Sequence, residues 1–135
     1  MLDSASFENL KNEMGRARQM GFKIATGSMQ PLIKAGDLIH VGTLDTSVVA
    51  RFDILVFWDG TRLVCHYLWH VNQLRLENGL KVYITRSLNP SGEDMPFSED
   101  RILGRVTNFR IPTATRVRLV IAALVQRWRQ GLLSR

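Results

Sequence analysis

The chain has 135 residues, 45% of them hydrophobic and 22% charged, with one cysteine and a formal net charge of +6. This composition fits one globular domain with a single core and excludes a disordered chain, and one cysteine excludes an internal disulfide. No cysteine or histidine at zinc-ligand spacing accompanies Cys65, so we expect neither a metal nor another cofactor.

The first predicted element is an amphipathic helix over residues 6–20. Its apolar residues recur at steps of three and four, at Phe7, Leu10, Met14 and Ala17. Gly21 is expected to end the helix, and its N-cap is one of Asp3, Ser4 and Ser6. The residues before it have neither the basic start nor the apolar run of a secretory signal, so we expect a cytoplasmic chain.

A series of short β-rich runs follows the helix. The predicted strands are residues 22–25, 38–41, 53–58, 62–69, 73–76, 80–84 and 102–106. A reverse turn is expected at 35–37, and Asp59-Gly60 and Asn78-Gly79 are hairpin signals. Residues 87–100 are rich in turn-forming residues and are predicted to be a polar loop. The expected fold class is therefore mainly β, an antiparallel sheet with a helix at each end.

The last predicted element is a basic amphipathic helix after Pro112. Its apolar stripe consists of Val117, Ile121, Leu124, Trp128 and Leu132. Residues 116–135 carry five arginines and no acidic residue, which suits a helix lying on an anionic membrane surface. The alternative is a helix that packs on the sheet through this stripe.

Other roles fit the C-terminal segment less well. The apolar run Leu119 to Val125 is too short to span a membrane. Nucleic acid is disfavoured as a partner, because neither an aromatic platform nor a recognised motif accompanies the arginines. The domain organisation that we expect is an N-terminal helix (1–21), a central domain (22–112) and the basic helix (113–135).

Ser28 is the first residue that indicates chemistry. It lies in a glycine-containing turn between two short apolar segments, where a hydroxyl and a backbone amide can both face a cleft. A Gly-Ser pair alone is more typical of an ordinary turn, so the surrounding residues decide its interpretation.

The run 27–41 resembles the signature of the signal peptidase I family and its self-cleaving repressor relatives. That signature is Gly-x-Ser-Met-x-Pro, followed after a few residues by Gly-Asp and a β-branched strand. The positions that match in identity and spacing are Ser28, Met29, Pro31, Gly36 and Asp37. Gly27 is shifted by one position from the family glycine.

The resemblance extends from about residue 22 to residue 106. Residues 51–57 look like the family's Gly-Asp-Ile-Val-Val-Phe strand, with Phe52 in place of the glycine. Residues 63–67 are similar to the Val-His-Arg segment of the endoplasmic-reticulum type, in which histidine replaces a lysine base; here His66 is kept and Tyr67 stands for the arginine. Residues 85–94 look like the family's Thr-Lys-Gly-Asp-Asn-Asn and Asp-Asp blocks, and residues 102–106 look like its Val-Gly-Lys-Val block.

The resemblance implies a serine endopeptidase that cleaves a leader or precursor peptide. Ser28 would be the nucleophile and His66 its general base, with Asp94 as the aligned carboxylate on the far ring nitrogen. The oxyanion would be held by the Ser28 amide with help from the Gly27 turn, and Met29 and Pro31 would shape the substrate site. The substrate would be an extended peptide with small residues near the cut.

Each of these assignments has an alternative. His66 can be a structural strand histidine, Asp94 a solvated turn residue, and Lys81 the base in place of His66. Leu88 stands where the family has a carboxylate that supports the catalytic loop or completes the triad. The alternative function is therefore a weak or inactive module of the same fold that binds peptides or the membrane surface.

Overall fold

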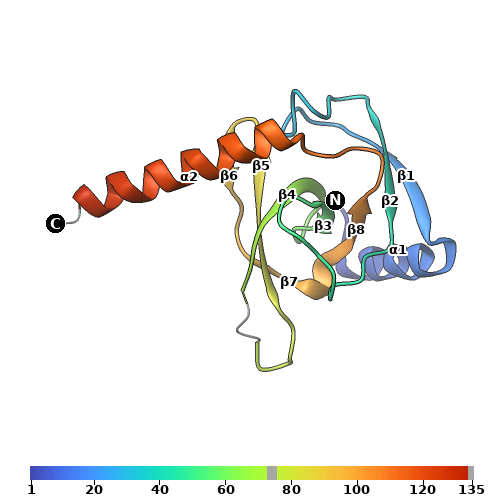
Figure 1. Cartoon of the computed structure of the whole chain (residues 1–135). Coiled ribbons are helices and arrows are strands. Elements are labelled where there is room, and N and C mark those ends of the chain that lie inside the picture. Colours follow the sequence, from blue (N-terminus) through green and yellow to red (C-terminus); the bar gives the residue numbers. More distant parts are fainter. Residues whose placement is uncertain (73–75, 134–135) are drawn as a thin grey trace.

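The computed structural model describes residues 1–72 and 76–133, of which 132 and 133 are described by their backbone alone. Within these residues the fold is mainly β, an antiparallel eight-stranded sheet with one helix at each end, as predicted (Figure 1). The elements are α1 (Ser4–Ala17), β1 (Gln19–Lys23), β2 (Leu38–Gly42), β3 (Ile54–Trp58), β4 (Leu63–Asn72), β5 (Val82–Leu88), β6 (Ser91–Glu93), β7 (Phe97–Ser98), the 3-10 turn η1 (Glu99–Arg101), β8 (Ile102–Val106) and α2 (Thr113–Leu133).

Helix α1 is shorter than predicted. Asp3 is its N-cap, because the Asp3 carboxylate accepts a hydrogen bond of 2.8 Å from the Ser6 amide. The helix ends at Ala17, where Arg18 adopts a left-handed conformation (φ 67°) and its amide donates to the carbonyl of Met14. The prediction that Gly21 ends the helix is wrong, since Gly21 lies inside β1 and pairs with β2.

Three turn predictions are confirmed. The turn at 35–37 uses a left-handed Gly36 (φ 93°), and Gly60 (φ 107°) lies in the hairpin that joins β3 to β4. The Asn78-Gly79 turn joins β4 to β5, which pair as a long antiparallel hairpin. Of the strand predicted over 73–76, residues 73–75 lie outside the described residues, and Leu76 is not in a strand.

The prediction of a polar loop over residues 87–100 is wrong in part. The segment contains the end of β5, the short strands β6 and β7, and the start of η1. Strand β6 folds back on β5 with Arg86 opposite Glu93, and β7 pairs with the other end of β5. Turn-forming residues thus make a tight return, which brings Asp94 back beside β5.

The sheet joins strands that are distant in the sequence. Its order is β1-β2-β8-β3-β4-β5-β6, with β7 paired to β5 beside this path. Strand β8 therefore inserts between β2 and β3, while β3, β4, β5 and β6 follow one another as a meander. Strand β1 is an edge strand, because it pairs with β2 alone among the described residues.

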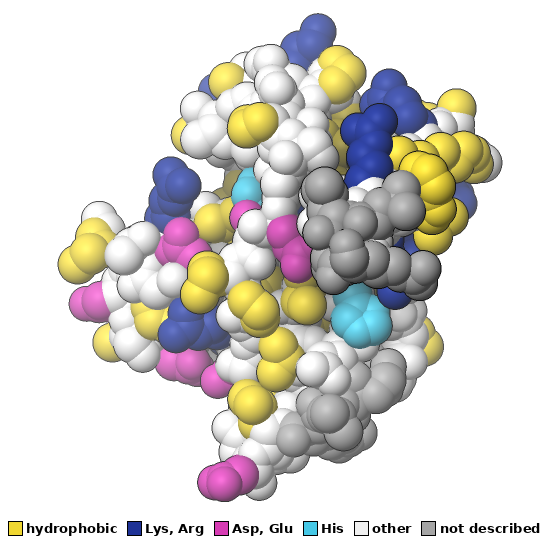
Figure 2. Space-filling view, turned by 90° about the vertical axis from the view of Figure 1, so that its left-hand side faces the viewer, with side chains coloured by type: hydrophobic (Ala, Val, Ile, Leu, Met, Phe, Trp, Pro, Cys, Tyr) yellow, Lys and Arg dark blue, Asp and Glu magenta, His cyan; other side chains and the backbone are white. Residues whose placement is uncertain are grey.

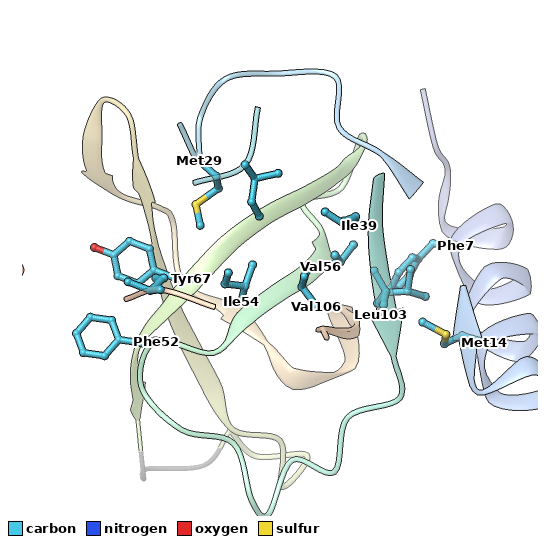
Figure 3. Packing of buried hydrophobic residues seen from close by; sticks show 13 residues of the cluster. Phe7, Met14, Met29, Ile39, Phe52, Ile54, Val56, Tyr67, Leu103 and Val106 are labelled. Carbon is cyan, nitrogen blue, oxygen red and sulfur yellow. The ribbon is translucent and has the colours of Figure 1, made fainter. Parts of the chain in front are cut away.

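The main core lies between α1, the sheet and the loop that follows β1. Phe7 and Met14 of α1 point toward Leu103 of β8, and Met29 of the loop lies near Tyr67 of β4 (Figure 3). Phe7 also stacks on Trp58, with ring centroids 5.2 Å apart. A second, smaller cluster includes Leu55, Phe57, Leu68, Tyr83 and Phe97.

Phe52 has a backbone conformation that glycine usually adopts. Its φ is 76°, and this is the position at which the resembled family carries glycine. The strain is offset by packing, because the buried Phe52 ring stacks on Tyr67 at 5.9 Å and meets the edge of Trp69 at 6.1 Å. The Arg116 guanidinium of α2 lies 5.4 Å from the centre of the Phe52 ring. Phe52 therefore contacts both strand β4 and the first turn of α2.

Helix α2 begins where predicted, after Pro112, and only part of it packs on the domain. Leu119 and Val120 pack against the main core, and Arg116 donates to the Ile111 carbonyl at 2.8 Å. The rest of the helix runs out past β6, so that the last described turns of α2 lie away from the sheet (Figure 1). Neither helix, as far as the described residues extend, is long and apolar enough to cross a membrane.

Candidate active site

Ser28 lies in a compact turn that is held in place by buried side chains and a backbone hydrogen bond. Met29 and Ile33 are buried and fix the turn in the core, while the Gln30 amide donates to the Gly27 carbonyl at 3.1 Å. Gly27 leaves room for the Gln30 side chain, since a Cβ on Gly27 would lie 3.1 Å from the Gln30 amide group. The turn therefore presents Ser28 while Met29 points inward.

The backbone at the end of β5 holds the carbonyl group of Ser28. The amides of Leu88 and Asn89 both donate to the Ser28 carbonyl, at 3.0 and 2.9 Å. The Ser28 amide stays the candidate oxyanion donor that the resemblance implies. Leu88 therefore contributes to the site through its backbone, and its side chain packs against the main core.

Three predicted residues form one chain of hydrogen bonds. Ser28 Oγ lies 3.1 Å from His66 Nε2, and His66 Nδ1 lies 2.6 Å from Asp94 Oδ2. A carboxylate only accepts hydrogen bonds, so Nδ1 carries the proton toward Asp94 and Nε2 can accept the Ser28 hydroxyl proton. The His66 side chain is 12% exposed, which shields this arrangement from water.

Asp94 is held in place by Thr85. The fully buried Thr85 hydroxyl donates to Asp94 Oδ2 at 2.7 Å, and the Asp94 amide donates to the Thr85 carbonyl at 2.9 Å. The same carboxylate oxygen thus accepts from both Thr85 and His66. Asp94 is therefore held against the imidazole by its hydrogen bonds, while its side chain keeps an exposed fraction of 27%.

The Ser28–His66 pair opens into a cleft of about 450 Å³. One wall is formed by residues 22–26 with Ser28 and Met29, and the other by residues 62–66. Apolar side chains on the cleft include Ile24, Ile39, Val56, Leu63 and Cys65. Gly27 and Pro31 shape the serine turn but do not line the cleft. An apolar, elongated ligand fits these walls better than a strongly charged one.

Each wall of the cleft has a backbone edge that pairs with no further strand within residues 1–72 and 76–133. Residues 63–66 of β4 pair with β3 on one side, and the pairing of β4 with β5 starts only at Tyr67. On the opposite wall, β1 pairs with β2 alone among the described residues. An extended peptide can therefore add as a strand between the two walls.

Burial controls the chemistry of the cysteine beside the site. Burial raises the pKa of the Cys65 thiol from 9.0 to about 12. The thiolate is the nucleophilic form, so Cys65 is a poor competitor of Ser28 at neutral pH. Within residues 1–72 and 76–133, no group of three or more His, Cys, Asp or Glu side chains could hold a metal ion.

The other candidate bases lie away from Ser28. Lys81 precedes β5, four residues before Thr85, which is about 13 Å along an extended strand. The Lys81 amide bonds to Glu99 at 2.9 Å. His40 on β2 and His70 on β4 are exposed and do not line the cleft. His66 is the base candidate that the fold brings to the serine.

Two contributions to the site were not predicted from the sequence. They are the Thr85 hydroxyl behind Asp94 and the pair of amides at Leu88 and Asn89. The available signal for Thr85 was its place two residues after Tyr83 in a β-rich run, on the same face of the strand, because a hydroxyl on a buried face needs a partner. The amides left no sequence signal, since any residue except proline supplies one.

The comparisons with known proteins do not identify a family. No family model matches the chain, and neither the curated proteins nor the solved structures contain a significant match.

Proposed function

We propose that the chain is a serine endopeptidase of the signal-peptidase type, which cleaves a leader or precursor peptide with Ser28, His66 and Asp94. One observation carries the proposal: the unbroken hydrogen-bond chain from Ser28 Oγ through His66 to Asp94, at 3.1 and 2.6 Å, at the floor of an apolar cleft. The distances lie within the range over which a base takes a serine proton.

The chemistry would proceed in two halves. Ser28 Oγ bonds to the peptide carbonyl carbon while His66 Nε2 takes the hydroxyl proton, and the carbonyl oxygen becomes an oxyanion facing the Ser28 amide. The C–N bond then breaks as His66 returns the proton to the leaving amine, which leaves an ester on Ser28. Water attacks this ester with His66 again as base, and Ser28 recovers its proton.

Asp94 would act through His66. Its negative charge fixes the imidazole in the tautomer that accepts at Nε2, and it stabilises the imidazolium that forms during attack. Thr85, by donating to the same oxygen, keeps the carboxylate oriented. The resembled family has a carboxylate where this chain has Leu88. In this arrangement catalysis would not need that carboxylate, because Asp94 supplies one to His66.

The substrate class follows from the cleft. A peptide in extended conformation would add its backbone to the free edge of residues 63–66, and its alternate side chains would enter the apolar cleft. Small or moderately sized apolar side chains near the cut match the lining of Ile24, Val56 and Cys65.

The test uses a serine-reactive fluorophosphonate probe together with a library of extended peptides. Wild type is expected to take one probe molecule, on Ser28, and to cut peptides after small or apolar residues. Ser28→Ala is expected to lose both the label and the cleavage, by at least about a thousandfold in rate. Ser47→Ala is the matched control, because Ser47 bonds to Asp45 in an exposed loop away from the cleft.

Two results decide against the proposal. If Ser28→Ala cuts peptides as fast as wild type, the residue is not the nucleophile. If wild type and Ser28→Ala both bind peptides and neither cuts them, the chain is a peptide-binding module.

A further inference from the structure

One face of α2 is left exposed by the way the helix is attached. The attached face carries Arg116, Leu119 and Val120. Large apolar side chains on another face are 42–66% exposed, and they are Val117, Ile121, Leu124, Val125 and Trp128. Steps of four, three and four from Val117 to Trp128 put these side chains in one stripe along the helix. The packing of α2 on the sheet therefore leaves its apolar stripe uncovered.

Arginines border this stripe. At about 100° per residue, Arg118 and Arg129 lie on one side of the stripe and Arg127 on the other, and all three are exposed. The sequence holds no acidic residue from 111 to 135. In Figure 2 hydrophobic and basic side chains adjoin one another at the upper right, beside the end of α2.

A basic groove continues the same surface between α2 and the sheet. This groove, of about 640 Å³, is lined among others by Arg51, Trp69, Arg86, Leu124 and Arg127. The Arg51 and Arg86 guanidinium groups lie 4.5 and 3.9 Å from the centre of the Trp69 ring. Among the described residues that line the groove, Glu93 is the only carboxylate, and it pairs with Arg86 at 3.1 Å. The groove thus keeps a net positive charge beside the apolar stripe.

We propose that the exposed stripe of α2 docks on an anionic phospholipid surface, with the flanking arginines and the basic groove facing the headgroups. An apolar stripe with cationic borders is the pattern of a helix that lies in the membrane interface. A second copy fits less well, because two such faces would bring arginine against arginine with no carboxylate on either helix. The proposal is independent of the proposed peptidase activity.

The test is flotation of the full chain with vesicles. Wild type is expected to float with vesicles of phosphatidylcholine and phosphatidylglycerol, to float poorly with phosphatidylcholine alone, and to detach at high salt. Ile121→Gln with Trp128→Gln is expected to lower binding at least about tenfold, and Arg127→Gln with Arg129→Gln about tenfold. Val48→Gln is the matched control, because Val48 is also largely exposed but lies outside α2.

Three outcomes overturn the proposal. The first is absence of binding to anionic vesicles, and the second is equal binding to both kinds of vesicle. The third is light scattering that shows a dimer in solution which the Ile121→Gln and Trp128→Gln changes dissociate, since the stripe then covers a second copy. Fluorophosphonate labelling of the same variants in the absence of vesicles separates this test from that of the peptidase function.

Discussion

Thr85 is the residue on which the orientation of Asp94 depends. Its hydroxyl and His66 Nδ1 both bond to Asp94 Oδ2, and the Thr85 side chain is completely buried. Nothing else bonded to that oxygen within the described residues could replace the hydroxyl. Thr85 is therefore a positioning residue for Asp94, and three hydrogen bonds separate its hydroxyl from that of Ser28.

Thr85→Val is expected to slow fluorophosphonate labelling of Ser28 about ten- to a hundredfold, because a hydrogen bond to a charged group is worth about 1.5–3 kcal/mol. Thr85→Ser keeps the hydroxyl and is expected to restore most of the rate. A purely structural role would give the opposite order of the two variants, since valine fills the buried space of threonine better than serine does.

At the scale of elements, Phe52 joins the sheet to α2. Phe52→Gly is expected to relieve about 1–2 kcal/mol of left-handed backbone strain but to lose about 3–5 kcal/mol of ring packing. The net result is a lower free energy of unfolding in urea and faster amide hydrogen exchange in the first turns of α2. A Phe52→Gly protein more stable than wild type would mean that the ring contributes little to holding the helix.

The contact between β2 and β8 depends on Gly104. A Cβ at this position would lie 2.3 Å from the Gly42 carbonyl oxygen and 2.8 Å from a Val41 methyl carbon. Gly104→Ala is expected to lower the free energy of unfolding by about 2–4 kcal/mol, or to prevent folding.

Gly15→Ala is the matched change in α1. Nothing lies within 4 Å of a Cβ at Gly15, so alanine is expected to raise the unfolding free energy by about 1 kcal/mol. Urea unfolding measures both variants, and circular dichroism shows whether Gly104→Ala folds. Equal stability of Gly104→Ala and wild type would contradict the close approach of the two strands.

For the whole molecule, three weak acids with raised pKa values make folding sensitive to alkaline pH. Burial raises the pKa of Cys65 to about 12 and raises the pKa values of Tyr67 and Tyr83 above 10.0. In the unfolded chain these groups ionise first, so the folded state binds more protons above about pH 9. This stability contribution is complete below pH 9 and is lost as pH rises through the folded pKa values.

The urea midpoint is therefore expected to fall as the pH rises from 9 to 11, and to fall further than surface charge alone requires. Cys65→Ala removes one of the three groups and is expected to reduce the decline. The raised pKa keeps the thiolate population of Cys65 at pH 8 far below that of an unfolded cysteine, so thiol reagents are expected to react slowly until the protein unfolds. Fast reaction in the folded state would contradict the raised pKa of Cys65.

Local patterns predicted the elements better than their arrangement. The hairpin at Asp59-Gly60 and the start of α2 after Pro112 depend on a few adjacent residues, and both are confirmed. The end of α1 was misjudged, because Arg18 takes the left-handed position for which Gly21 was the expected residue. The insertion of β8 between β2 and β3 depends on contacts across more than 40 residues, which no local pattern contains.

The candidate site was also predicted only in part from the sequence. The resemblance selected Ser28, His66 and Asp94, and the fold brings these three side chains together. The sequence did not predict the role of Thr85, because its hydroxyl meets Asp94 only after β6 has folded back on β5. The sequence left two interpretations of the apolar stripe of α2, a membrane-facing stripe and a stripe packed on the sheet. The choice depends on which face of the helix the sheet covers, and this follows only from the fold.

The open strand edges that flank the cleft have a cost for solubility. An edge with unpaired backbone groups can pair with the same edge of another molecule and begin aggregation. Lys23 on β1 and Arg62 beside β4 place charges at these edges, as gatekeeper residues do in other sheets. A peptide bound between the walls would pair both edges at once, so peptide binding would also protect the protein from self-association.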